Sequence, residues 1–183
     1  QLEESMTGSF NGGLSYSEHD GGILNFSVSQ RNLFGTGRSI KFSTEYKQTG
    51  DSRYSLSLTT PYWFDTLFTN TFSIFSSFIP DDDYDTTTLG FNYGLSYPIW
   101  KDWRASTNYS WRNEQYSNVS SDGEESLGGI NNNSYKSFLT GLKYSTVNNP
   151  MFPSNGFEAS LNVEQFGGVF GGSTDYREYT FNS

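Results

Sequence analysis

The only histidine of the chain, His19, stands beside Asp20 and close to several serines. A histidine placed between an acid and a serine nucleophile is the arrangement that many hydrolases use, with the imidazole as general base. Geometry defines such a triad, however, and no nucleophile motif accompanies His19. A solvated loop histidine beside an acid is the favoured interpretation, and we predict that the chain is not an enzyme.

Two acidic clusters carry carboxylates of the kind that bind Ca²⁺, at Asp81–Asp85 and at Asp122–Glu125. Neither has the spacing of an EF-hand loop or its glutamate at the twelfth position. Runs of charge are more often solvated loop tips than ligand sets. The sequence therefore predicts no metal site and no cofactor.

Composition limits the classes of protein to which the chain can belong. A net charge of −9, from 20 acidic and 11 basic residues, argues against nucleic-acid binding. Hydrophobic residues make up only 33% of the chain, yet aromatic residues reach 18%, which a disordered chain would lack. The chain has no cysteine, so its fold needs no disulfide. A polar chain rich in aromatics fits strands that have one apolar and one polar face.

Alternation of apolar and polar residues is the dominant pattern, and no helical periodicity competes with it. Leu89, Phe91, Tyr93, Leu95 and Tyr97, for example, alternate with small or polar residues. Most of the predicted strands are near the length that a tilted membrane strand requires, about 9–11 residues. We expect ten strands, at 9–16, 24–29, 39–47, 53–59, 68–74, 89–99, 103–112, 138–144, 157–164 and 176–181.

The connections between these strands are of two alternating kinds. One kind is polar and acidic, and the other is short and aromatic. Outer-membrane barrels show this asymmetry, with long external loops, short periplasmic turns and aromatic girdles. The pattern predicts an all-β, antiparallel transmembrane β-barrel of the bacterial outer membrane. The polar joints are 18–22, 48–52, 80–85, 118–134 and 167–175, and the aromatic ones are 33–37, 61–65, 98–102 and 150–153.

The same asymmetry predicts the orientation of the chain. If the aromatic turns are periplasmic, the N-terminus lies on the periplasmic side. The longest joint, 118–134, then lies outside the cell. Because it is rich in Gly, Asn, Ser and Asp, we expect it to be an irregular and mobile loop.

Four stretches of the chain resemble motifs of the BamA-type family of outer-membrane insertases, in the family's order and at about its spacing. Their turn residues would have structural roles, because glycine permits positive φ and proline fixes φ where a strand stops. The residues concerned are Gly35, Thr36, Gly37, Pro61, Tyr62, Phe152, Pro153 and Gly156. The stretches are Met6–Asn11 in the first strand, Gln30–Gly37 after the second, Thr60–Tyr62 after the fourth and Asn149–Gly156 after the eighth.

The resemblance implies a partial domain. A complete barrel of this family has about sixteen strands, an even number within the range of such barrels. Residues 1–183 would then form a partial barrel domain with about ten of them. The periplasmic POTRA domains, the sixth external loop with its VRGF motif and the last strands of the family are not found in the sequence.

The resemblance also implies a function for the first strand as a lateral gate that binds client strands. Glycine weakens a strand and lets another backbone approach, which suits addition of a client strand to its edge. The implied partners are client barrel proteins, periplasmic accessory lipoproteins, the lipid bilayer and lipopolysaccharide. The gate residues would be Gly8, Ser9, Phe10, Asn11, Gly12, Gly13, Leu14, Ser15 and Tyr16.

Two alternatives stay open on the sequence alone. One is a related family member that secretes a dedicated passenger or assembles autotransporters. The other is a passive porin or adhesin barrel, in which the glycines of the first strand merely relieve crowding among aromatic side chains.

Overall fold

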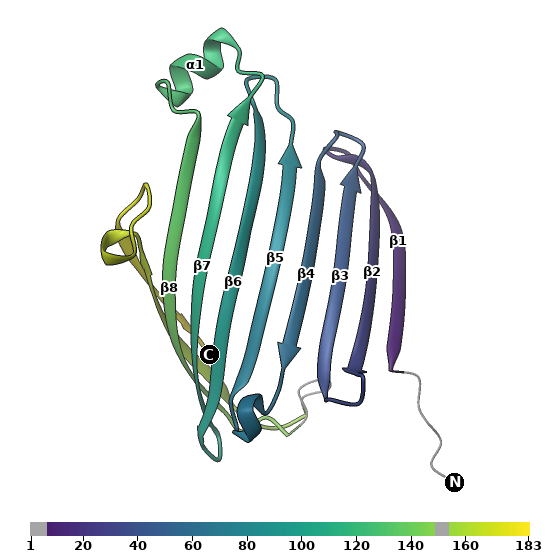
Figure 1. Ribbon diagram of the computed structural model, residues 1–183, viewed down its shortest axis with the longest axis vertical. Helices are drawn as coiled ribbons and strands as arrows, with labels where there is room; N and C mark the ends of the chain where they lie inside the picture. Colours follow the sequence, from purple (N-terminus) through teal and green to yellow (C-terminus); the bar gives the residue numbers. More distant parts are fainter. Residues whose placement is uncertain (1–6, 149–153) are drawn as a thin grey trace.

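The computed structural model describes residues 7–148 and 154–183, which form one sheet of ten antiparallel strands (Figure 1). Each strand pairs only with its neighbours in the sequence, in the order β1 to β10. The predicted all-β, antiparallel fold and its ten strands are confirmed. The strands are β1 Gly8–Ser17, β2 Gly21–Leu33, β3 Arg38–Lys47, β4 Ser52–Thr60, β5 Thr69–Ile79, β6 Asp85–Trp100, β7 Trp103–Ser117, β8 Asn132–Ser145, β9 Glu158–Phe166 and β10 Tyr176–Asn182.

Strand length varies across the sheet more than the sequence predicts. β6, β7 and β8 have 16, 15 and 14 residues, whereas β4 has 9 and β10 has 7. The longer strands extend beyond their alternating segments through residues such as Thr86–Thr88 and Asn113–Gln115. No helix in the described residues is both long enough and apolar enough to cross a membrane.

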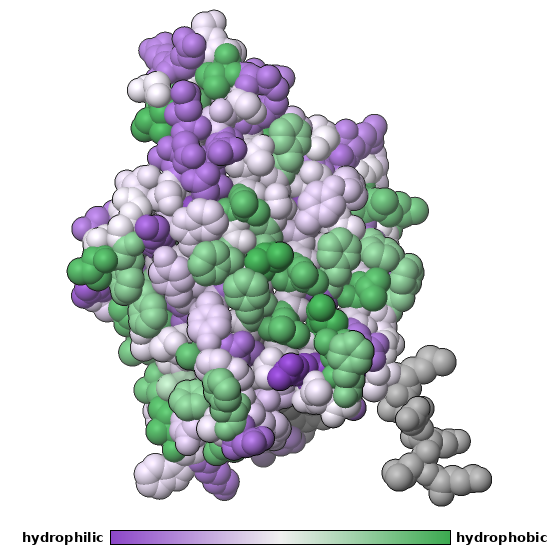
Figure 2. Space-filling model, in the orientation of Figure 1, coloured by the Kyte–Doolittle hydropathy of each residue, from purple (hydrophilic) through white to green (hydrophobic). Residues whose placement is uncertain are grey.

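The sheet is a single layer without a hydrophobic core. Among the described residues no hydrophobic side chain is buried, and the only buried polar ones are Asn70 and Ser137. The register instead places most apolar residues of the strands on one face, as in the row Leu58, Phe72, Tyr93. Figure 2 shows hydrophobic side chains gathered over the middle of that face, with hydrophilic ones around α1. We call it the outward face, because the sheet curls away from it and β9 and β10 pass behind (Figure 1).

Aromatic pairs connect neighbouring strands across the outward face. Phe91 of β6 contacts the rings of Phe72, Tyr109 and Trp111 on the two adjacent strands, with centroids 5.7–6.2 Å apart. Such cross-strand pairs each contribute about 0.2–1 kcal/mol in a sheet. Because the sheet has no core, its strands are held together by these lateral contacts and by the backbone hydrogen bonds.

The longest predicted connection contains a helix, which corrects the expectation of an irregular loop at 118–134. Seven of its residues form helix α1, Ser121–Leu127, and β8 already begins at Asn132. The Ser120 hydroxyl caps the helix by accepting from the Gly123 amide at 3.1 Å, and Gly128 ends it in the left-handed conformation. The Ser120 amide donates to the Asp83 carbonyl at 2.8 Å, so the helix is fastened to the neighbouring turn.

The polar face also carries aromatic side chains, among them Tyr135 of β8 and Phe166 of β9. Another is Phe75 of β5, which alternation does not predict. Its ring lies over Gly90 of β6, the residue opposite it in the register. A Cβ at position 90 would lie 2.5 Å from the Phe75 ring and 2.6 Å from the Trp111 carbonyl oxygen. Gly90 is therefore required by packing, in contrast to Gly94 four residues later, whose nearest such contact is 3.3 Å.

Replacing Gly90 with alanine is expected to destabilise the sheet by about 1–3 kcal/mol, the usual cost of overpacking. Gly94→Ala is the matched control in the same strand and should cost much less. Urea unfolding of the lipid-reconstituted protein, followed by tryptophan fluorescence, would measure both. Equal stability of the two variants would contradict the packing described for Phe75.

Candidate functional site

The candidate site is the free edge of β1, which contains all nine residues predicted to form the gate, from Gly8 to Tyr16. β1 pairs with β2 and with no other strand among the described residues. An edge strand presents a row of unpaired N–H and C=O groups, which is a template for pairing with another strand. The other edge of the described sheet is β10, which pairs only with β9.

The middle of β1 is weakly packed. Leu14 and Tyr16 are 85% and 76% exposed on the outward face, and Tyr179 and Phe181 of the other edge strand, β10, are similarly exposed, at 66% and 68%. Gly13 has open space where a Cβ would lie. The one aromatic contact of β1 among the described residues joins Phe10 to Phe26 of β2, edge to face, at 4.9 Å. Little side-chain packing would thus be lost if this strand exchanged partners.

The inner end of β1 is tied to β2 by polar contacts. The Arg31 amide donates to the Thr7 carbonyl at 2.8 Å, and the Ser9 and Ser29 hydroxyls share a hydrogen bond of 2.7 Å. Both contacts lie at the end of the strand that follows the N-terminus. The Arg31–Thr7 bond extends the backbone ladder by one residue beyond Gly8, the first position of β1.

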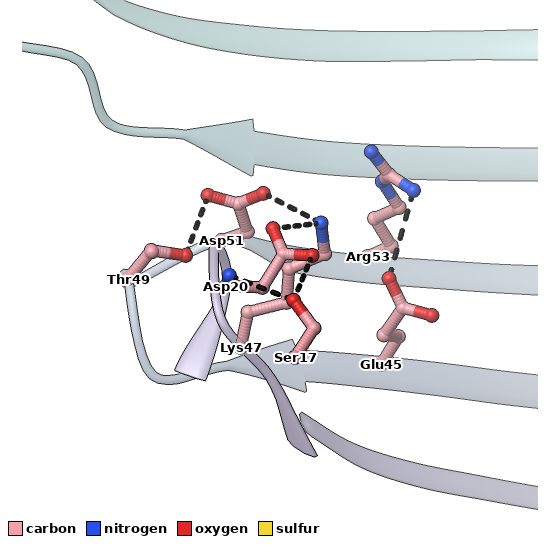
Figure 3. Close-up of polar contacts among 7 residues, drawn as sticks. All are labelled: Ser17, Asp20, Glu45, Lys47, Thr49, Asp51 and Arg53. Atoms are coloured by element: carbon pink, nitrogen blue, oxygen red, sulfur yellow. Dashed lines mark hydrogen bonds and ion pairs between the residues drawn. The ribbon is translucent and has the colours of Figure 1, made fainter. Parts of the chain in front are cut away.

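The outer end of the β1–β2 hairpin is held by a charged cluster that we call the outer latch, formed by Ser17, Asp20, Lys47 and Asp51 (Figure 3). The Lys47 ammonium lies 2.7 Å from an Asp20 oxygen and 3.5 Å from an Asp51 oxygen. The Asp20 amide donates to the Ser17 hydroxyl at 2.9 Å, which fixes the turn that carries the carboxylate. The latch joins the β1–β2 turn to the β3–β4 turn across β2.

The three charged side chains of the outer latch are partly shielded from solvent. Lys47, Asp20 and Asp51 are 16%, 24% and 14% exposed. The hydrogen bond from Lys47, with its positive charge, holds the pKa of the Asp20 carboxyl below its usual value of 3.8. Sequence reasoning missed this cluster, because nothing in the chain order says that the two turns are neighbours across β2. The only indication of the cluster in the sequence is a lysine that stands at a strand end beside acidic turns.

The polar face of β1 to β5 is hollowed, with a concavity of about 740 Å³. Asn11, Asn25, Ser43 and Phe75 are among the residues that line it. Glu45 and Arg53 also line it and form an ion pair of 3.5 Å. The concavity beside the candidate edge thus combines polar side chains and an ion pair with the ring of Phe75.

The structure places the predicted turn residues where the sequence expects them. Gly35 and Gly37, both with φ of +72°, lie in the β2–β3 turn, where the Thr36 hydroxyl donates to the Leu33 carbonyl at 2.6 Å. Pro61 and Tyr62 follow β4, and Gly156, with φ of +126°, precedes β9. Phe152 and Pro153 lie outside the described residues, as does Met6.

One contributor to the β2–β3 turn was not predicted. Asn32 adopts a left-handed conformation, with φ of +54°, and its side-chain oxygen accepts from the Gly37 amide at 2.8 Å. Asparagine tolerates this conformation better than most residues. Its place at the start of the motif is the signal that could have found it.

The residues considered for catalysis or metal binding lie apart from one another. His19 is exposed in the β1–β2 turn. In the part of the chain that the structure describes, no group of three or more His, Cys, Asp or Glu side chains could hold a metal ion. The Asp81 carboxylate accepts from the Asp83 amide at 3.2 Å, so it stabilises its own turn.

Comparison with known proteins agrees with this fold. The model of the Omp85 superfamily domain matches residues 32–183. The crystal structure of BamA from Haemophilus ducreyi lacking POTRA domains 1-3 is similar over 90% of this chain, with a TM-score of 0.67 and 19% sequence identity. The chain spans 35% of the length of that BamA chain. No curated protein matches the sequence.

The outer latch yields a testable prediction. Lys47→Met should remove both ion pairs and accelerate hydrogen exchange of the outer amides of β1 by about two- to fivefold, since solvent screening keeps the contribution of such pairs small. Arg53→Gln is the control, because the Arg53–Glu45 pair is more exposed and joins residues within the sheet. Exchange of residues 14–17, measured by mass spectrometry in lipid nanodiscs, would report the difference.

The effect of Lys47→Met on hydrogen exchange should depend on pH in a defined direction. Because folding lowers the pKa of Asp20, its stabilising contribution is present above about pH 3.8 and disappears as the pH falls through the lowered value. The native protein and Lys47→Met should therefore differ at pH 7 and converge in strong acid. If the two exchange equally fast at pH 7, or if Arg53→Gln has the same effect, the latch does not hold the hairpin.

Proposed function

Because the chain belongs to the Omp85 superfamily, we propose that it forms part of a BamA-type barrel that folds client β-barrel proteins into the bacterial outer membrane. Proteins of this family are non-enzymatic insertases or transporters, which agrees with the prediction that the chain is not an enzyme. The BamA-like barrel fold implies an outer-membrane location. The activity proposed is that of a whole barrel, of which this chain supplies one part.

The observation that carries the proposal is the loosely packed middle of β1, which makes one aromatic contact among the described residues and has open space beside Gly13. In a complete barrel β1 would be paired at the closing seam. Where that seam opens in lipid, an unpaired backbone N–H or C=O costs several kcal/mol, so a client strand gains by pairing there. Folding of the client supplies the free energy, and no nucleotide is needed. Because Leu14 and Tyr16 make few contacts, the strand can change partners at small cost. This is β-strand addition at a membrane seam.

We further propose that residues 1–183 are a partial barrel domain. An open sheet with free edges at β1 and β10 would leave backbone groups unpaired in lipid, and closure of the barrel removes such edges. Closure of a BamA-type barrel requires more strands than these ten, about sixteen in total. The POTRA domains and the remaining strands would complete the protein.

The proposed orientation puts the N-terminus and the aromatic turns on the periplasmic side. Phe34, Phe64 and Trp100, in three of these turns, are exposed large apolar side chains at one rim of the sheet. Aromatic residues are enriched at membrane interfaces. The opposite rim carries α1 and the outer latch, which are polar and suit the cell exterior.

The height of the outward apolar band supports a second part of the mechanism. On β4 the band runs from Tyr54 to Leu58, whereas on β6 it runs from Leu89 to Ile99. A bilayer that matches a shorter apolar band becomes locally thinner. We propose that thinning beside β1–β4 lowers the barrier to client insertion near the gate.

The proposed partners follow from this location. Client barrel strands would bind at β1, and periplasmic accessory lipoproteins would bind on the side of the aromatic turns. The bilayer and lipopolysaccharide would cover the outward face. A relative that secretes a passenger or assembles autotransporters would use the same fold, whereas a passive porin or adhesin has no use for an exchangeable edge.

Crosslinking tests the gate directly. In the full-length protein, cysteines that replace Ser9, Asn11 or Ser15 are expected to form disulfide adducts with cysteine-bearing client strands during assembly. Ser43→Cys and Ser55→Cys are the controls, because β3 and β4 are paired on both edges. This sequence has no cysteine of its own to compete.

The pattern of adducts distinguishes the candidate functions. Adducts with many different barrel clients at β1 alone support the insertase. Adducts with a single secreted passenger would point to the secretory relative. No adducts at β1, together with a large steady conductance in single-channel recording, would replace the proposal with a passive pore.

A further inference from the structure

The β9–β10 connection contains a glycine-flanked apolar segment, Gly167–Gly172, that we call the outer loop. It includes the 3₁₀ helix η2, Gly168–Phe170. The Phe170 ring stacks on Phe138 of β8, with centroids 5.4 Å apart and planes inclined by 19°. Phe138 lies opposite Tyr109 in a row of the outward face. The outer loop therefore folds onto the apolar side of the sheet, while the rest of the polar connections stand at its rim.

The backbone of the outer loop is largely satisfied within the protein. The Gly167 amide donates to the Lys136 carbonyl at 2.8 Å, and the Ser173 amide donates to the Ser134 carbonyl at 2.7 Å. Inside the loop, Phe170 and Gly171 donate to Gly167 and Gly168 at 3.1 and 3.0 Å. A loop whose amides are paired in this way can lie against apolar material at a small desolvation cost.

Between the two glycine pairs, Val169 projects away from the protein. It is 93% exposed, and Phe170 beside it continues the outward aromatic surface. An isolated exposed valine would need no explanation. Here the valine stands at the tip of a segment that already packs on the lipid-facing side, and the segment is continuous with the outward band.

Two basic side chains lie at the outer boundary of this surface. Lys136 is opposite Trp111 and Arg177 is opposite Gln165, so the register puts both on the outward face. Neither pairs with an acidic side chain among the described residues, in contrast to Lys47 or Lys143. The other cationic side chains near this end of the strands are on the polar face. They are Lys47, Arg53 and Arg112. Cations at this position match the phosphate groups of lipid headgroups.

We propose that the outer loop is a lipid-binding element of the external leaflet. Val169 and Phe170 lie at the boundary of the acyl chains, and Lys136 and Arg177 bind the phosphates of a phosphorylated outer-leaflet lipid. The aromatic stack provides the apolar floor and the two cations provide the charge. This inference rests on the membrane orientation proposed above but does not depend on the gate, because the loop belongs to the opposite edge of the described sheet.

The position of the loop is tested by fluorescence quenching. Val169→Cys, labelled with an environment-sensitive dye in the reconstituted full-length protein, should be quenched by lipids that carry a nitroxide on the acyl chain and shielded from iodide. Leu161→Cys, on the outward face of β9, is the lipid-exposed reference, and Glu125→Cys, on α1, is the water-exposed one. A label at position 169 that behaves like the one at position 125 would overturn the proposal.

The cation site is tested with vesicles of defined composition. Phosphatidylcholine vesicles with and without lipid A should bind the native protein differently, and the Lys136→Gln/Arg177→Gln variant should lose affinity for lipid A on the order of fivefold per cation removed. Lys41→Gln/Arg104→Gln, with both changes on the polar face, is the control with the same total change in charge. Retained affinity in the Lys136→Gln/Arg177→Gln variant, or an equal loss in the control, would exclude a specific phosphate site.

The two experiments are separable from the test of the gate. Both loop variants should still form client adducts at Ser9→Cys if they fold, which circular dichroism of the sheet would show. Loss of lipid A affinity with intact crosslinking supports the lipid site alone. Loss of crosslinking with intact lipid binding would instead contradict only the proposed insertase function.

Discussion

The hydrogen-bonded pairing of backbone strands is the interaction on which the whole molecule depends. A single-layer sheet has no interior, and in the described residues no hydrophobic side chain is buried by the protein itself. The free energy that a soluble domain gains from its core has to come here from lipid on the outward face. The strands are then joined laterally by backbone ladders and aromatic pairs, in a medium where an unpaired amide is costly. The edge of the sheet is consequently its most reactive part.

The structure controls this edge by holding its ends and leaving its middle loose. Thr7 and Ser9 tie the inner end of β1 to β2, and the outer latch fastens the hairpin to the next one. Between them the strand carries Gly12 and Gly13, and its outward side chains have little cover. We propose that such an arrangement keeps β1 in register while allowing it to exchange its partner on the other side. The short apolar band of the nearby strands would act beside the same edge, by thinning the lipid bilayer instead of by binding the client protein.

Most of the fold could be predicted from the sequence, because a period of two is a local property. Residues such as Phe91, Tyr93 and Leu95 report the strand and its lipid-facing side without knowledge of any neighbour. The turns were predictable for the same reason, since Gly35 and Gly37 show their need for positive φ in the sequence. The order of the strands followed once short connections were assumed.

What could not be predicted depends on contacts between elements. Helix α1 has seven residues, too few for a periodic signal, and the Asp83 carbonyl that anchors it belongs to another turn. Phe75 lies on the polar face because Gly90 leaves room for its ring on the adjacent strand. The outer latch joins two turns separated by a strand. The residues predicted to form the gate all lie on β1, but the open space beside Gly13 becomes visible only in the structure.

The central claim is that one face of the sheet contacts lipid and the other contacts water. Spin labels placed in turn at each position from Arg53 to Thr59 of β4 would test it, by collision with oxygen, which concentrates in lipid, and with a water-soluble nickel complex. The account predicts two alternating patterns with a period of two residues and opposite phase, with oxygen favoured at Tyr54, Leu56 and Leu58. If those three positions were inaccessible to both reagents, the apolar face would be packed inside a protein core and the account would be wrong.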